Sequence, residues 1–117
     1  MAVNLPSIFT FGSNLAGIHG AGSAAEAYRN HGAEWGIGRG PTGRSYAIPT
    51  KDANLEPLSL HEIHENVRRF IIYADRHPEL RFHVVKIGCG YAGYMETEIR
   101  PFFENAPSNC ILPEGWR

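Results

Sequence analysis

The residues of this chain best suited to chemistry are Lys51 and Asp52, which directly follow an apolar run at residues 45–48 and Pro49–Thr50. An unprotonated lysine amine is a nucleophile and can form a covalent intermediate with an electrophilic carbon. Alternatively, Lys51 pairs with phosphate or is solvated. Asp52 either polarises a substrate hydroxyl group or caps a turn. Both lie where a strand of an open α/β sheet would end, which is where such folds bind ligands.

Two glycine-rich segments, residues 12–22 and 88–94, could hold an anion. Each follows an apolar run and precedes a segment with helical features. Glycines let backbone N–H groups approach an anion closely, and a helix N-terminus favours negative charge. The alternative is a pair of tight turns without a ligand. The residues predicted to contact a ligand are Asn14, His19, Gly20, Ala21, Gly22, Gly88, Cys89, Gly90, Tyr91, Ala92 and Gly93.

Strands and helices that would position these residues alternate along the chain. Apolar runs predict strands at residues 8–11, 45–48, 81–87 and 110–112, the second ended by Pro49. Helices are predicted from residue 22 or 23 to 30, from a capping box at Ser59 to about His77, and from residues 96–98 to 103. Residues 33–44 form a second glycine cluster. It is predicted to be a loop, because its Gly-x-Gly-x-x-Gly pattern contains Pro41 and leads into a strand instead of following a strand and opening a helix. Residues 113–117 are predicted to be a tail.

Alternation of strand, loop and helix predicts parallel strands in an α/β fold. The carboxyl ends of parallel strands meet at one edge of the sheet, so both glycine segments and Lys51 would line one cleft. Such a cleft suits a ligand that carries a diphosphate.

Length and composition set further expectations. A chain of 117 residues with 43% apolar and 20% charged residues is typical of a single globular domain. A net charge of −1 predicts no general nucleic-acid-binding surface, and the lack of a long apolar segment predicts no membrane span. Two distant cysteines indicate a reduced, cytoplasmic protein. His61 and His64 could hold a metal in principle, but they are better explained as a solvated helix face, so no metal or cofactor is expected.

Three motifs together resemble the macro domains. The first is Phe11-Gly-Ser-Asn-Leu-Ala-Gly-Ile-His-Gly-Ala-Gly-Ser-Ala, which is similar to the first ligand loop of that family. Ile87-Gly-Cys-Gly-Tyr-Ala-Gly-Tyr is similar to the loop that cradles the diphosphate. Together with Ile48-Pro-Thr-Lys51, these motifs are most similar to the branch of the terminal ADP-ribose protein glycohydrolase and the antitoxin that removes ADP-ribose from DNA. The resemblance covers residues 8–112.

This resemblance implies a compact three-layer α/β/α fold with a mostly parallel central sheet, and ADP-ribose or an ADP-ribosylated macromolecule as the partner. Lys51 would attack the anomeric carbon, and Asn14 would bind the distal ribose or only form a turn. Tyr91 and Tyr94 would stack on the ligand or pack in the core, and Cys89 would be a nucleophile or a buried filler. The expected function is therefore lysine-dependent de-ADP-ribosylation.

One departure supports a second hypothesis. The eukaryotic glycohydrolase of this branch has an acid shortly after Gly-Cys-Gly, where this chain has Tyr91-Ala92-Gly93, whereas the antitoxin lacks the acid and depends on its lysine. The alternative function is thus a module that binds or sequesters ADP-ribose, or a related nucleotide, without turnover.

Overall fold

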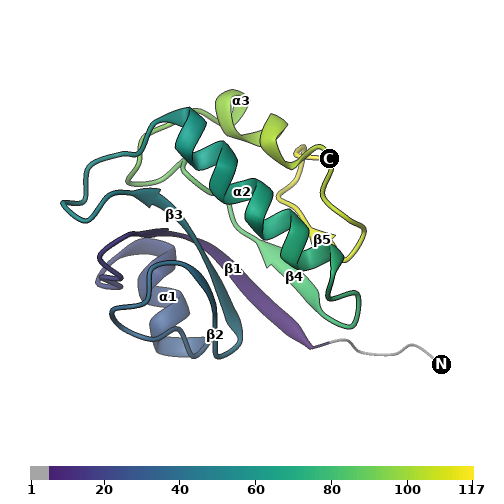
Figure 1. Ribbon diagram of the computed structural model, residues 1–117, viewed down its shortest axis with the longest axis horizontal. Coiled ribbons are helices and arrows are strands. Elements are labelled where there is room, and N and C mark those ends of the chain that lie inside the picture. Colours follow the sequence, from purple (N-terminus) through teal and green to yellow (C-terminus); the bar gives the residue numbers. More distant parts are fainter. Residues whose placement is uncertain (1–5) are drawn as a thin grey trace.

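Five strands form one sheet, in the order β2-β3-β1-β4-β5, in the computed structural model, which describes residues 6–117 (Figure 1). Three neighbouring pairs, β3 with β1, β1 with β4 and β4 with β5, are parallel, whereas the short edge strand β2 is antiparallel to β3. The sheet is therefore mixed but mostly parallel. The strands are β1 (Ser7–Asn14), β2 (Gly40–Thr42), β3 (Ser45–Lys51), β4 (Arg81–Val84) and β5 (Cys110–Ile111).

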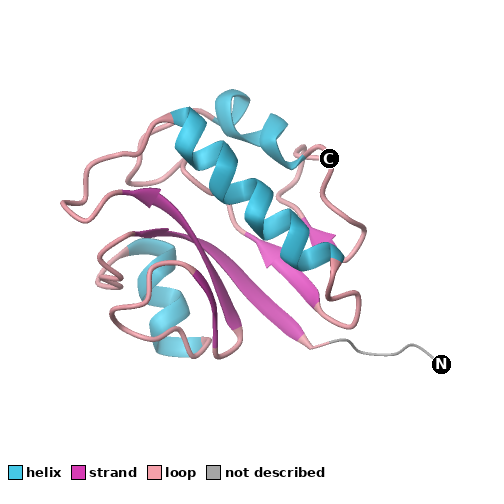
Figure 2. Cartoon of the chain, in the orientation of Figure 1, coloured by secondary structure: helices cyan, strands magenta, loops and turns pink. Residues whose placement is uncertain are grey.

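Helices cover both faces of this sheet (Figure 2). On one face lies α1 (Gly22–Asn30), whose alanines Ala24 and Ala27 allow close packing against β1 and β3. The opposite face is covered by α2 (Leu60–Asp75), α3 (Glu96–Ile99) and a 3₁₀ turn, η1 (Arg100–Phe103). The expected α/β fold with helices on both faces is therefore present.

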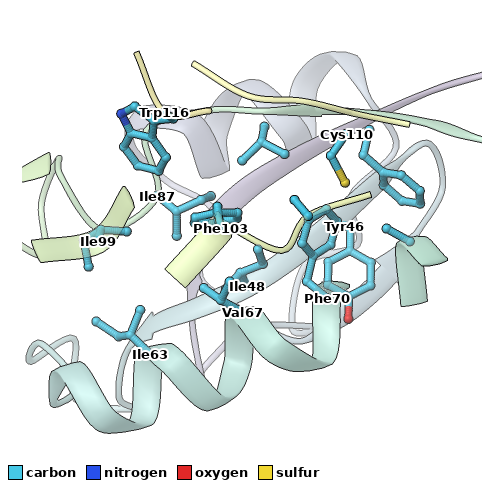
Figure 3. Packing of buried hydrophobic residues seen from close by; sticks show 14 of the residues in the cluster. Tyr46, Ile48, Ile63, Val67, Phe70, Ile87, Ile99, Phe103, Cys110 and Trp116 are labelled. Carbon is cyan, nitrogen blue, oxygen red and sulfur yellow. The ribbon is translucent and has the colours of Figure 1, made fainter. Parts of the chain in front are cut away.

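The larger part of the core lies beneath α2 (Figure 3). Ile63, Val67 and Phe70 recur at helical spacing on the buried face of α2, and the ring of Phe70 meets that of Phe82 with centroids 5.3 Å apart. The predicted capping box is confirmed in part. The Glu62 N–H donates to Ser59 Oγ, but the Glu62 carboxylate accepts from the Ser59 hydroxyl group instead of from the Ser59 N–H. No helix in residues 6–117 has both the length and the apolar character that crossing a membrane requires.

The prediction that Pro49 ends the second strand is wrong, because β3 continues to Lys51. Proline is tolerated in a strand where no neighbouring strand needs its N–H. Strand β2 pairs with residues 45–47 only, and beyond that point the Pro49 carbonyl accepts a hydrogen bond of 2.9 Å from Asn66 Nδ2 of α2. Pro49 pairs with Ser13 of β1, and on the side away from β1 its backbone faces a side chain instead of another strand.

Other boundaries also differ from the sequence predictions. Strand β1 continues to Asn14 instead of ending at residue 11, so the first three residues of the first glycine segment belong to the strand. Residues 33–44 include a strand, β2, rather than only a loop, and β4 ends at Val84 instead of Ile87. The C-terminal residues are not a tail. Trp116 is only 4% exposed and packs against Phe103, while the Arg117 guanidinium donates hydrogen bonds to the carbonyls of Ala106, Pro107 and Cys110.

Candidate functional site

A cleft of about 520 Å³ opens at the carboxyl ends of β1, β3 and β4. The segments that the sequence places at strand ends meet there, because the three strands are parallel neighbours. Of the residues predicted to form a site, those that line the cleft are Asn14, Gly20, Ala21, Gly22, Lys51, Gly88, Cys89, Gly90, Tyr91 and Ala92.

The charged side chains among the described residues that line this cleft are both lysines. Lys51 and Lys86 are the two lysines of the sequence, and both line the cleft. Among residues 6–117, no aspartate, glutamate, arginine or histidine lines it. The first turn of α1 also borders the cleft, and the residue before this helix, Ala21, has no side chain that could accept its free N–H groups. Two ammonium groups and a helix N-terminus favour an anionic ligand.

The first glycine segment is held in shape by Asn14. Its Nδ2 donates to the Ile18 carbonyl at 2.8 Å, and the Ile18 N–H donates to Oδ1 at 2.9 Å. The predicted turn-forming role of Asn14 is therefore confirmed. An amide side chain retains one further N–H and one further lone pair in this arrangement, so Asn14 can still contact a ligand in the cleft.

His19 does not line the cleft, contrary to the prediction that a ligand would meet it. Its side chain is 1% exposed, and Nε2 lies 2.9 Å from the carbonyl oxygen of Glu34 and 3.1 Å from that of Ile37. Because both partners are acceptors, Nε2 carries the proton and donates. His19 thus fastens the first glycine segment to residues 34–37.

The second glycine cluster supports the same segment. A Cβ atom at Gly38 would lie 1.9 Å from the carbonyl oxygen of Asn14, so the two backbones are in contact. The hydroxyl group of Ser13 donates to the carbonyl of Gly38. Residues 33–44 therefore form a scaffold for the cleft rather than only a connection between α1 and β3.

Asp52 and Gly93 also lie outside the residues that line the cleft. Asp52 Oδ1 accepts hydrogen bonds from the N–H groups of Asn54 and Glu56, at 2.8 and 3.0 Å. The turn-capping interpretation of Asp52 is correct, and its predicted catalytic position is not observed. Gly93 closes a turn through its N–H, which donates to the Gly90 carbonyl at 3.0 Å.

Tyr91 and Tyr94 have different roles in the structure. Tyr94 packs against the core and donates from its hydroxyl group to the Leu58 carbonyl at 2.7 Å, as the packing alternative predicted. Tyr91 is 70% exposed and lines the cleft, where Lys51 Nζ lies 5.0 Å from the centroid of its ring. The aromatic ring that is free to meet a ligand is therefore that of Tyr91.

The Cys89 thiol is half-buried in the cleft wall and is a poor nucleophile. Burial raises its pKa, and the nearby carboxylate of Glu96 raises it further. A thiol with a raised pKa stays protonated near neutral pH and does not react readily. No group of three or more histidine, cysteine or acidic residues in residues 6–117 could hold a metal ion, and the ring of His64 stacks on Phe102 with centroids 4.4 Å apart.

Sequence reasoning missed several residues of the cleft, of which Lys86 is the most important. It was expected within the third predicted strand, but β4 ends at Val84 and Lys86 emerges into the following loop. One signal was available, since Lys86 is one of only two lysines and directly precedes the second glycine segment. The other missed residues are Gly12, Ser13, Ile18, Ser23, Ala24, Thr50, Leu55 and Val85.

Comparison of the chain with the profiles of known protein families, with curated proteins and with solved structures found no match in any of the three.

Proposed function

We propose that the cleft binds ADP-ribose or a related NAD-derived nucleotide, and that Lys51 promotes hydrolysis of an ADP-ribosyl linkage. The observation that carries this proposal is that both glycine segments and Lys51 line one cleft from which described acidic side chains are absent. The macro domain resemblance of the same segments supports it. The volume of about 520 Å³ is within the range of small-molecule and cofactor sites.

In this proposal the diphosphate lies between the first turn of α1 and the backbone of residues 88–91. Helix N-termini and closely spaced backbone N–H groups bind phosphate oxygens. A Cβ atom at Gly90 would meet no heavy atom within 4 Å, so there is open space on this side of the loop. Asn14, at the end of β1, would contact the ribose on the Lys51 side, since these two residues are paired in the β1–β3 register.

The proposed reaction uses the amine of Lys51. Nζ attacks the anomeric carbon, and the bond from that carbon to the leaving group breaks with its electron pair on the leaving group. The leaving group takes the proton that Nζ gives up, and water then releases ADP-ribose and restores the amine. Asp52 is excluded as the proton donor in this scheme because it caps a turn outside the cleft.

One contact favours the second function, a binding module without turnover. A cation–π contact stabilises an ammonium group rather than a neutral amine. With Nζ 5.0 Å from the centroid of the Tyr91 ring, Lys51 would act as a cation that pairs with phosphate. Turnover would then require ligand binding to separate Lys51 from Tyr91.

Calorimetric titration with ADP-ribose, with AMP and NAD as comparisons, tests the binding step. Gly90→Glu should abolish binding because it places a carboxylate beside the phosphate, whereas Gly90→Ala adds no charge and should weaken binding far less. No heat with wild type, or equal binding by both variants, would contradict the site.

Turnover is tested separately, by incubating the protein with ADP-ribosylated protein and ADP-ribosylated DNA. Loss of label with wild type and its retention with Lys51→Ala would support the lysine-dependent reaction. Binding without loss of label would favour the non-catalytic function, and equal activity of Lys51→Ala would exclude the proposed mechanism.

A further inference from the structure

Lys86 is the second positive charge of the cleft and has no role in the proposal above. It follows β4, borders the second glycine segment and lines the cleft together with Lys51. The nine arginines of the sequence could supply charge equally well, yet no arginine of residues 6–117 lines the cleft. Both lysines of the chain are therefore gathered at one site, without a neighbouring carboxylate in the cleft lining.

Two polar contacts in series, from Lys86 to Glu96 and from Glu96 to Trp116, position the side chain of Lys86. Its Nζ lies 3.2 Å from Glu96 Oε2, at the start of α3. The other oxygen of the same carboxylate, Oε1, accepts a hydrogen bond of 2.8 Å from Trp116 Nε1. Because Trp116 is 4% exposed and packs on Phe103, Glu96 is anchored to the core. Lys86 is thus held beside the cleft by a fixed partner.

Lys51 and Lys86 flank the end of β1 from opposite sides. Strands β3 and β4 both pair with β1, so they lie two strand spacings apart, about 10 Å. The two phosphates of a diphosphate are adjacent, whereas Lys51 is the last residue of β3 and Lys86 follows the end of β4. Lys51 pairs in register with Asn14 at the end of β1, and Lys86 lies next to the loop of residues 88–91. The two lysines are therefore placed to contact different parts of one ligand.

We propose that Lys86 neutralises the phosphate charge of the ligand by exchanging Glu96 for a phosphate group, which leaves Lys51 to act at the other end of the cleft. The assignment of Lys51 to chemistry rests on the proposed function, whereas the phosphate contact of Lys86 is independent of it. Lys86 is a binding residue in this scheme, and Glu96 is the partner that the Lys86 ammonium group leaves when phosphate binds.

Both Lys86 and Glu96 keep polar partners when the Lys86 ammonium group moves from the Glu96 carboxylate to a phosphate. Exposed ion pairs are weak, and the side chains of Lys86 and Glu96 are 56% and 43% exposed. When Lys86 turns to a phosphate, the Glu96 carboxylate keeps its hydrogen bond from Trp116 and its access to water. The phosphate, in contrast, gains an ammonium group beside the backbone N–H groups of the second glycine segment.

Titration with inorganic pyrophosphate tests this contact without adenosine or ribose. Lys86→Gln should weaken pyrophosphate binding at least tenfold and Lys51→Gln less than threefold, because the phosphates lie next to Lys86. Arg68→Gln is the matched control, since Arg68 also forms an exposed 3.2 Å pair, with Glu65, but does not line the cleft. Glu96→Gln should tighten binding, because it removes the anion that competes with phosphate and keeps an acceptor for Trp116.

A second readout uses the fact that the chain has two lysines. Reductive methylation with ¹³C-formaldehyde labels the two lysine amines and the α-amino group and preserves their charge, and Lys86→Gln and Lys51→Gln assign the two lysine signals. Addition of pyrophosphate should shift the Lys86 signal by more than the Lys51 signal. A larger shift at Lys51, or a wild-type protein that does not bind pyrophosphate, would overturn the inference.

The two proposals fail in different ways. If Lys86→Gln binds both ADP-ribose and pyrophosphate as tightly as wild type, the phosphate contact is wrong and the proposed function stands. If pyrophosphate binds as expected and loses affinity in Lys86→Gln, but ADP-ribose binds no better than pyrophosphate, the contact of Lys86 is correct and the ADP-ribose function is wrong.

Discussion

Lys51 Nζ lies 5.0 Å from the centroid of the Tyr91 ring, so a side chain from the end of β3 meets one from the second glycine segment across the cleft. The first residue of α1 lies against the same ring, because a Cβ atom at Gly22 would be 2.8 Å from Tyr91 Cε2. Tyr91 thus contacts the other two segments of the cleft while 70% of its surface remains exposed. The Tyr91 ring therefore lies next to both the first turn of α1 and Lys51.

A double-mutant cycle measures the contact between these two residues. Tyr91→Leu and Lys51→Met should each lower the free energy of unfolding, and the coupling between them should be about 0.5–1 kcal/mol, as for exposed cation–π pairs. Tyr91→Phe retains the ring face and should preserve the coupling. Urea denaturation provides the four free energies, and strictly additive effects would show that the contact contributes nothing to stability.

Gly38 should be intolerant of substitution because of its contact with Asn14. Gly38→Ala would place a methyl group 1.9 Å from the Asn14 carbonyl oxygen, which forces the backbones apart. We expect a loss of several kcal/mol, as for other overpacked sites. Gly90→Ala is the control, because its Cβ atom has no neighbour within 4 Å and it should change stability by less than about 1 kcal/mol. Similar melting temperatures for the two variants would contradict this packing.

The features that follow from local sequence were predictable. Helix α2 combines an N-cap at Ser59 with apolar residues at helical spacing, and both signals are independent of the rest of the fold. The gathering of the glycine segments and Lys51 followed from the parallel order of the strands. Neither inference required knowledge of distant contacts.

The features that depend on distant partners were not predictable. Strand β3 passes through Pro49 because, on the side away from β1, Asn66 of α2 rather than a strand faces its backbone. His19 turns into the protein because carbonyls of residues 34 and 37 accept its proton, and the sequence does not indicate that residues 33–44 fold back on the first glycine segment. The end of β4 at Val84, which places Lys86 in the loop that lines the cleft, was likewise not indicated by the apolar run that continues to Ile87.

Trp116 should be essential for stability although it is the penultimate residue. Its side chain fills the core next to Phe103, with ring centroids 5.5 Å apart, so Trp116→Ala should cost about 3–5 kcal/mol. Trp116→Phe should cost less because it keeps most of the apolar contact and loses only the hydrogen bond to Glu96. Urea denaturation followed by far-UV circular dichroism compares wild type with both variants, because this readout does not depend on Trp116 itself. A neutral Trp116→Ala variant would show that the C-terminal residues do not belong to the core.

The pH dependence of stability should reflect the hydrogen bond between Glu96 and Trp116. This bond is the main cause that lowers the pKa of the Glu96 carboxyl below its ordinary value, and the pair with Lys86 lowers it further. A carboxyl group whose pKa is lower in the folded state than in the unfolded state stabilises the folded protein. This contribution is complete above the pKa of the unfolded state, about 4.3, and is lost as pH falls through the pKa of the folded state. Glu96→Gln cannot show this loss, because its amide does not titrate.

Urea denaturation of wild type and Glu96→Gln at pH 6 and at pH 3 separates the contribution of Glu96 from general acid destabilisation. The advantage of wild type over Glu96→Gln should be present at pH 6 and smaller at pH 3. Trp116→Phe removes the principal hydrogen-bond donor to Glu96. In that background, the change in stability that Glu96→Gln causes should therefore depend less on pH than it does in wild type. An advantage that is the same at both pH values would mean that Glu96 is not held by Trp116, and the two contacts in series that position Lys86 beside the cleft would lose their anchor.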